Sequence, residues 1–191
     1  MKDVQNFLDL PDNLPTPTDD GKCGHLPGLA IPLLPLLATN GNRVDLSSLP
    51  GRTVVYCYPK TGRPGHPLPD GWDSIPGARG CTPQACSFRD HYHELIRAGA
   101  DQVFGLSTQD TDYQREAAER LELPFPLLSD SAQAFTTALN LPAFEFAGET
   151  LLKRFTIVVD SGRISKVLYP VFPPNQSGEE TLRWLLENQR V

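Results

Sequence analysis

Proline is the feature that most restricts how this chain can fold. It accounts for 19 of the 191 residues, about twice the usual share of roughly 5%. Eight prolines lie in two irregular stretches, residues 1–28 and 60–80: Pro11, Pro15, Pro17, Pro27, Pro64, Pro67, Pro69 and Pro76. Because proline has no N–H group and breaks helices, neither stretch suits a helix or an inner strand. We therefore predict an irregular N-terminal arm over residues 1–28 and a long loop over residues 60–80.

The residues between these stretches indicate β-structure. A turn sequence at residues 40–42 follows an apolar segment, and residues 53–58 read Thr-Val-Val-Tyr-Cys-Tyr. A short run of β-branched and aromatic residues is typical of a strand that is buried on both faces. We expect residues 53–58 to form a central strand.

After the loop, the pattern alternates between helix and strand. Thr82 as N-cap and Pro83 as the next residue predict a helix over residues 82–97, with Gly99 as its stop. The closing helix is expected from about Glu179, with Leu182, Leu185 and Leu186 on its buried side. Between these helices the pattern predicts a strand at 102–107, helices at 111–121 and 131–140, and a hairpin of residues 154–160 and 164–169.

This order of elements predicts an α/β domain over residues 29–191. Strands that alternate with helices form a mostly parallel sheet with helices on both faces, and the final hairpin adds antiparallel strands. The expected fold is thioredoxin-like: a central mixed sheet flanked by helices, preceded by the irregular arm.

Charge and hydropathy exclude some classes of partner. The formal net charge is −6, and lysine and arginine form no cluster, so neither nucleic acid nor an anionic membrane is expected as a partner. The apolar run at residues 26–38 contains three prolines and is shorter than the roughly 20 residues of a membrane span. The start of the chain does not resemble a secretory signal. We expect a cytoplasmic protein, in which a cysteine pair is more often catalytic, redox-active or metal-binding than structural.

The four cysteines have different sequence contexts. Cys57 lies within the predicted central strand and is expected to be a core residue, whereas Cys23 lies in the arm and is expected to be a surface thiol. Cys81 immediately precedes the helix predicted at 82–97, where free N–H groups and the helix dipole favour an anion. Cys86 lies off the apolar side of that helix. We expect both Cys81 and Cys86 to be accessible.

Helix geometry tests two roles for this pair. Cys81, Cys86, His91 and His93 would point near 0°, 140°, 280° and 120° at about 100° per residue, so they cannot converge on one zinc ion. As a disulfide, Cys81 and Cys86 would need Cα atoms within about 7 Å, whereas an intact helix separates them by about 8.6 Å. We therefore predict a redox pair whose oxidation unwinds the first helical turn, and neither a metal nor a cofactor.

The residues around this pair resemble those of the peroxiredoxins. Tyr58-Pro59-Lys60, and then residues 80–90, which read Gly-Cys-Thr-Pro-Gln-Ala-Cys-Ser-Phe-Arg-Asp, are similar to the Q type, also called bacterioferritin comigratory proteins. The resemblance extends to Leu-Leu-Ser-Asp at residues 127–130 and to Arg154, six residues before Asp160. It covers residues 29–191.

The resemblance implies a thiol-dependent peroxidase that reduces hydrogen peroxide and organic hydroperoxides. Cys81 would be the peroxidatic thiolate and become a sulfenic acid, and Cys86 would resolve it as an intramolecular disulfide. Thioredoxin or a similar dithiol would reduce that disulfide. Arg154 would hold the thiolate and polarise the peroxide, and Pro59 would shield the thiolate. A monomer or a weak dimer is expected.

One position departs from the family pattern. The family has a proline seven residues before the cysteine and a threonine three before it, whereas here Pro59 and Cys81 are 22 residues apart and Ala78 replaces the threonine. The loop is thus 15 residues longer, and Thr61, Ser74, Thr82 or the loop backbone would have to replace the missing hydroxyl. We expect Trp72 to pack against the body near the thiol, so that the loop acts as a fixed lid.

Two other functions fit a cysteine pair in this fold. A thiol–disulfide oxidoreductase of the thioredoxin type normally has two residues between its cysteines, whereas four separate them here. A non-catalytic redox sensor or binding module would use the loop as its interface. Hydroperoxide consumption with a thioredoxin system, compared with reduction of insulin disulfides, separates the three functions.

Overall fold

A seven-stranded mixed sheet forms the centre of the computed structural model, which describes residues 7–189. Its strand order is β2-β1-β5-β4-β3-β8-β9, with β3, β4 and β5 parallel and the others antiparallel. The strands are β1 (Leu36–Ala38), β2 (Arg43–Val44), β3 (Arg52–Cys57), β4 (Gln102–Ser107), β5 (Leu127–Ser129), β8 (Phe155–Asp160) and β9 (Arg163–Leu168). The thioredoxin-like fold class and the central position of residues 53–58 are confirmed.

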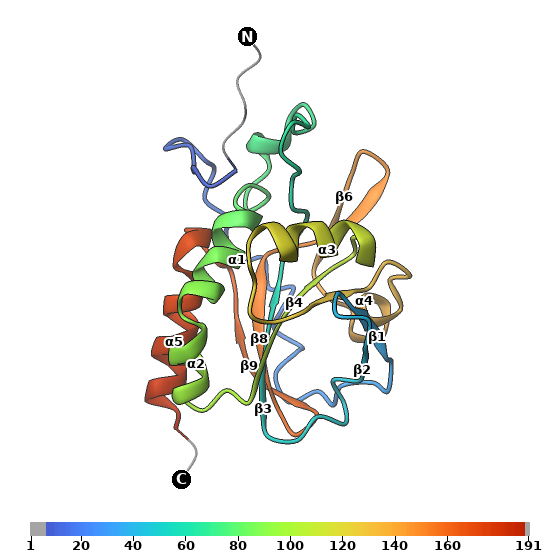
Figure 1. Ribbon diagram of the computed structural model, residues 1–191, viewed down its shortest axis with the longest axis vertical. Helices are drawn as coiled ribbons and strands as arrows, with labels where there is room; N and C mark the ends of the chain where they lie inside the picture. The colour runs from blue at the N-terminus through green and yellow to red at the C-terminus, as the bar shows by residue number, and fades with distance from the viewer. Residues whose placement is uncertain (1–6, 190–191) are drawn as a thin grey trace.

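Helices cover both faces of this sheet (Figure 1). They are α1 (Cys81–Asp90), α2 (Tyr92–Arg97), α3 (Thr111–Arg120), α4 (Ala134–Leu139) and α5 (Ser177–Glu187). A separate hairpin pairs β6 (Ala143–Phe146) with β7 (Glu149–Leu152). Within the loop, residues Trp72–Ser74 form one 3-10 turn, η1, and Pro174–Gln176 form a second, η2, just before α5.

Successive side chains of β3 face two separate hydrophobic core clusters. Val55 and Cys57 face a cluster that includes Phe135 and Leu139 of α4. Val54 and Tyr56 face a second cluster, formed with residues of α1, α2 and α5. Successive strand residues point to opposite faces, so a strand buried on both sides must be apolar throughout.

The arm packs onto the α4 side of the molecule. Leu26 is fully buried, and Cys23 is only 7% exposed in the same core cluster. Asp20 ties the arm down, because its carboxylate accepts hydrogen bonds from Lys153 Nζ at 2.6 Å and from Tyr169 Oη at 2.8 Å. The prediction that Cys23 is a surface thiol is therefore wrong: the arm folds inward at this point.

The helix predicted at 82–97 is two helices. It begins at Cys81, with Gly80 rather than Thr82 as the N-cap, and it breaks at His91. The His91 ring Nδ1 lies 2.9 Å from the Ser87 carbonyl oxygen, which it shares with the backbone N–H of His91. The backbone of His91 leaves the helical region at this point, with φ of −96° and ψ of 7°.

Two further expectations about helices need correction. Leu186 is 54% exposed, so it does not belong to the buried side of α5, whereas Leu185 is buried as expected and Thr181 lies beside it in the core. The helix expected at 131–140 is limited to α4. The α5 helix packs so closely on α1 that the N–H group of Gly178 donates to Ser87 Oγ at 2.9 Å.

Candidate active site at the start of helix α1

Cys81 is the first residue of α1, and a glycine sets its position. Gly80 has φ of 103°, a left-handed conformation that glycine adopts readily. A Cβ atom at Gly80 would also overlap Pro174 Cγ. The sulfur therefore lies at the positive end of the helix dipole, where the backbone N–H groups of the first turn have no partner within the helix.

Arg154 contacts the sulfur of Cys81. Its Nη2 lies 3.3 Å from Cys81 Sγ and donates to the carbonyl oxygens of Ala78 and Arg79, each at 3.1 Å. Arg154 is only 3% exposed and directly precedes β8. These contacts hold a positive charge and a hydrogen-bond donor against the sulfur, where they stabilise negative charge on it.

Gln84 is a site residue that the sequence analysis missed. Its Oε1 accepts a hydrogen bond from Arg154 Nη1, and its Nε2 donates to Ser177 Oγ at 3.4 Å. The Gln84 side chain is fully buried. It follows Cys81 by three residues and so lies on the same side of the helix, a spacing that marks a polar residue next to the thiol.

Cys86 lies in the same helix and is 8% exposed, whereas Cys81 is 4% exposed. The expectation that both thiols are accessible is wrong, because α5, the loop and the end of α3 cover α1. Burial raises the pKa of the Cys86 thiol, and the nearby cations Arg89 and Arg120 oppose that rise. Both thiols are free, and an intact helix keeps their Cα atoms about 8.6 Å apart, beyond the reach of a disulfide.

The loop surrounds the site from the other side. Ala78 is fully buried, and its carbonyl oxygen lies 3.7 Å from Cys81 Sγ in addition to accepting from Arg154. Of the suggested substitutes for the missing threonine, Thr61 donates its hydroxyl to Gln109 Oε1 and Ser74 donates to Gly71 O. Neither of these two hydroxyls is directed to the thiol. Thr82, the third candidate, is buried directly after Cys81, and its substitution for the missing hydroxyl stays a prediction.

Trp72 anchors the loop, as expected. It is 3% exposed and forms a small core with Ala78 and Leu151, and its ring meets that of Phe146 edge-on at 5.3 Å. Pro59 is buried just past the end of β3. Its shielding role stays a prediction.

A cavity of about 220 Å³ lies next to Arg154, between the arm and the loop. Pro17 of the arm, Ile75 and Pro76 of the loop and Phe144 of β6 form its apolar wall, and Asp20, Lys153 and Tyr169 lie at its polar end. This cavity reaches Arg154 from a side that neither α1 nor α5 covers.

The remaining cysteines lie on the opposite face of the sheet. Cys57 is fully buried within β3, as expected. Burial raises the pKa of Cys23 to about 12 and that of Cys57 well above its ordinary value. Within residues 7–189 no three His, Cys, Asp or Glu side chains gather as metal ligands, and no helix there is long and apolar enough to cross a membrane.

Sequence comparison decides the family. The family model described as Redoxin matches residues 12–182. This chain belongs to the Redoxin family. It is similar to peroxiredoxin Q of Oryza sativa subsp. japonica, with 36% identity over 166 residues that cover 85% of this chain and 68% of the relative. It is likewise 35% identical over 160 residues to peroxiredoxin Q of Populus jackii, covering 83% of this chain and 67% of the relative. Both relatives are chloroplastic.

Solved structures of peroxiredoxins have the same fold. Peroxidoxin BcpB from Mycobacterium tuberculosis superposes with a TM-score of 0.68 at 24% identity, covering 87% of this chain and all (100%) of that one. Peroxiredoxin Q from Xanthomonas campestris superposes with a TM-score of 0.66 at 22% identity, covering 87% of this chain and 98% of that one. The resemblance to the Q type is confirmed. The protein is a thiol-dependent peroxidase, so it reduces a hydroperoxide and is itself reduced by a thiol.

Proposed function

We propose that Cys81 is the peroxidatic residue of this peroxiredoxin and that Arg154 activates both the thiol and the substrate. This proposal rests on the 3.3 Å contact between Arg154 Nη2 and Cys81 Sγ at the start of α1. The thiolate attacks the terminal oxygen of the hydroperoxide, and the O–O bond breaks. The sulfur becomes a sulfenic acid, and the leaving oxygen takes a proton to give water or an alcohol.

Arg154 suits this role because its guanidinium is already oriented. Gln84 and the carbonyl oxygens of Ala78 and Arg79 accept its hydrogen bonds, so no reorientation is needed when the leaving oxygen gains charge. Gln84 is a positioning residue in this scheme, since it acts on the reaction only through Arg154. Pro59 keeps water from the thiolate.

Cys86 is the resolving residue in the same proposal. Its thiol attacks the Cys81 sulfenic acid, an S–S bond forms and water leaves. Because both cysteines are helical in the reduced protein, α1 must unwind at its start before the two sulfur atoms can meet. Thioredoxin or a similar dithiol then reduces the disulfide, which the unwinding of α1 uncovers, and both thiols are restored.

The substrate route follows the cavity between the arm and the loop. Hydrogen peroxide and organic hydroperoxides reach Arg154 from this side, past Ile75, Pro76 and Phe144. Trp72 fixes the loop as a lid on that route, and the Ala78 carbonyl oxygen, which is only an acceptor, holds Arg154 beside the thiol.

Burial distinguishes this proposal from a thioredoxin-type oxidoreductase. Exchange with a protein disulfide needs an exposed sulfur, whereas Cys81 and Cys86 are 4% and 8% exposed. A small peroxide enters a narrow site that a protein disulfide does not. A cytoplasmic location and a monomer or weak dimer belong to the same proposal, tested by fractionation and by light scattering.

Trapping of the intermediate tests the assignment of the two thiols. In the Cys86→Ser variant, one equivalent of hydroperoxide should leave a sulfenic acid on Cys81 that a dimedone-type reagent labels, as detected by mass spectrometry. Cys23→Ser is the matched control and should form the disulfide without labelling. A label on another cysteine, or sustained thioredoxin-driven turnover in Cys86→Ser, would contradict the assignment.

A further inference from the structure

A second cavity, of about 200 Å³, lies between the first half of the loop and α3. Residues 60–69 and Trp72 form most of it, and Tyr113 of α3 closes it. Neither active-site cysteine nor Arg154 lines this cavity, so the peroxidase reaction does not account for it. Its volume suits a ligand with one ring rather than a peptide or a nucleotide.

Aromatic and apolar side chains form the wall of this cavity. Trp72 is almost fully buried and is held in place by Phe146, so it presents a fixed surface. Tyr113 and Leu68 complete the wall. Flat, rigid side chains of this kind bind an aromatic ring with little loss of conformational entropy.

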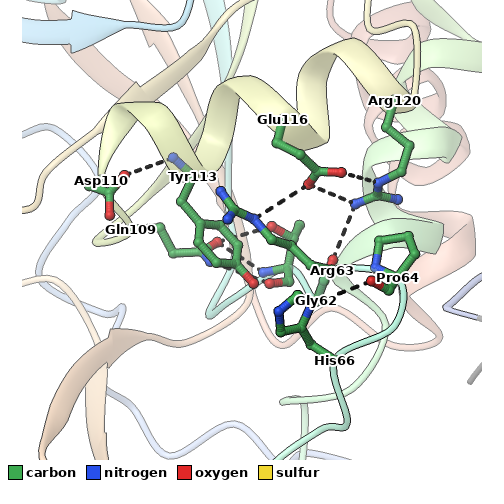
Figure 2. Close-up of polar contacts among 10 residues, drawn as sticks. Gly62, Arg63, Pro64, His66, Gln109, Asp110, Tyr113, Glu116 and Arg120 are labelled. Atoms are coloured by element: carbon green, nitrogen blue, oxygen red, sulfur yellow. Dashed lines mark hydrogen bonds and ion pairs between the residues drawn. The ribbon is translucent and has the colours of Figure 1, made fainter.

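Two cations and a histidine line the same cavity, without an acidic residue: Lys60, Arg63 and His66. The Arg63 guanidinium lies over the Tyr113 ring, 4.0 Å from its centroid (Figure 2). This stacking fixes the guanidinium plane at the edge of the cavity. Lys60 and Arg63 have carboxylate neighbours, Glu149 and Glu116, but only the cations line the cavity, which favours an anionic ligand there.

The hydrogen bonding of Arg63 is incomplete. Its Nε is buried and donates no hydrogen bond among the described residues, and the carboxylate oxygen with which it pairs, Glu116 Oε2, is 3.8 Å away. That carboxylate is already bound by Arg120, whose Nε lies 2.7 Å from Glu116 Oε1 and whose Nη2 donates to Gly62 O (Figure 2). The Nε faces Glu116, so a ligand carboxylate in the cavity would accept hydrogen bonds from the Nη groups of Arg63, whose side chain is 35% exposed.

We propose that this cavity binds a small aromatic carboxylate. The ring lies between Trp72 and Tyr113, and the carboxylate accepts hydrogen bonds from Arg63, with Lys60 contributing charge. Lys60 is itself paired with Glu149 at 2.6 Å, so Arg63 is the principal anchor. The site is separate from the reaction at Cys81 and does not depend on the assignment of the catalytic residues.

Binding of phenylacetate to the reduced full-length protein tests the proposal. The chain has two tryptophans, so a Trp184→Phe background leaves Trp72 as the only indole reporter. We expect saturable quenching of Trp72 fluorescence by phenylacetate and at least about tenfold weaker binding of neutral phenylacetamide, the loss of one charge-assisted contact. Equal binding of acid and amide, or no saturable quenching, would overturn the proposal.

Variants locate the site. Arg63→Gln should weaken phenylacetate binding about tenfold, whereas Arg115→Gln, on α3 with Tyr113 but outside the cavity, should leave it unchanged. Leu68→Phe keeps both cations, adds no second indole and narrows the cavity, so it should weaken binding even if Arg63→Gln loosens the loop. Wild-type affinity in either Arg63→Gln or Leu68→Phe, or a matching loss in Arg115→Gln, would place the ligand elsewhere and overturn the proposal.

Discussion

The four cysteines form two pairs with similar burial and different surroundings. Cys81 and Cys86 are 4% and 8% exposed, and Cys23 and Cys57 are 7% and 0% exposed. The first pair lies in a helix, with Arg154 against the Cys81 sulfur and with Arg89 and Arg120, each paired with a carboxylate, near Cys86. The second pair lies in an apolar core. Burial therefore does not separate Cys81 from a structural thiol here; the contact with Arg154 does.

Electrostatics around the second pair favours the neutral thiol. For Cys23, burial is the main cause of a pKa raised to about 12, and the carboxylates of Asp19 and Asp20 raise it further. Lys153 opposes this rise, but it is already paired with Asp20. A cation near a thiol thus has little effect when a carboxylate binds it first, whereas Arg154 faces carbonyl and amide oxygens and keeps its full charge.

The largest expected difference between the pairs is loss of activity. Cys81→Ser should lower the rate of hydroperoxide reduction by more than about 10³-fold, because removing the nucleophile removes the reaction path. Cys23→Ala should retain the rate within about twofold, since it changes only packing far from α1. The measurement is peroxide consumption coupled to a thioredoxin system. Retained activity in Cys81→Ser would move the nucleophile to the other pair.

Arg154 should account for the next largest effect. Arg154→Gln keeps most of the side-chain volume and removes the charge, so the second-order rate constant with hydrogen peroxide should fall about 100-fold. Arg154→Lys should recover part of the loss, because the charge returns without the planar array of donors. Stopped-flow kinetics measures both. A rate for Arg154→Gln close to that of the wild type would show that the neighbouring charge does not distinguish the pairs.

More of the active site than of its surroundings could be predicted from the sequence. The Cys81–Cys86 spacing, the strand before the loop and Arg154 are local patterns, and the structure brings Arg154 to Cys81 as the family resemblance implies. The burial of Cys23 was not predictable, because it depends on contacts between residues far apart in sequence, such as Asp20 with Lys153. Gln84 has a local signal, its position three residues after Cys81, but its partners Arg154 and Ser177 come from distant elements and could not be predicted.

Oxidation should change the structure around Cys81 and Cys86 but not around Cys23 and Cys57. A Cys81–Cys86 disulfide does not fit an intact α1, so the first turns of that ten-residue helix should unwind. Far-UV circular dichroism should show a small loss of helix, and amide exchange should lose protection over residues 82–90. Amide protection over β3, which ends at Cys57, should stay constant. Equal protection of residues 82–90 in both redox states would show that the disulfide forms without unwinding.

Alkylation should distinguish the pairs by pH. With its pKa raised to about 12, Cys23 should be about 0.01% thiolate at pH 8 and its labelling by iodoacetamide should rise about tenfold per pH unit above that. Deprotonation disfavours the folded state, so the stabilising contribution of this thiol is complete below pH 9 and is lost between pH 9 and 12. Peptide mapping should find Cys23 unlabelled in the native protein at pH 8 and labelled in urea. Rapid native labelling of Cys23 would mean that the arm does not hold it in the core.

The smallest effect should come from the access of substrate to the thiol, which also differs between the two cysteine pairs. The arm encloses Cys23, whereas Arg154, which contacts Cys81, lines the cavity that the loop bounds with Ile75 and Pro76. Shortening the loop by 15 residues and restoring threonine at position 78 removes that wall and supplies the missing hydroxyl. The rate constant with cumene hydroperoxide should rise a few-fold, because a bulky group gains room, while that with hydrogen peroxide should change by less than about twofold. A matched variant with only Ala78→Thr separates the hydroxyl from the lid. Unchanged rate constants for both peroxides in the shortened protein would mean that the loop neither limits access to Cys81 nor replaces the threonine.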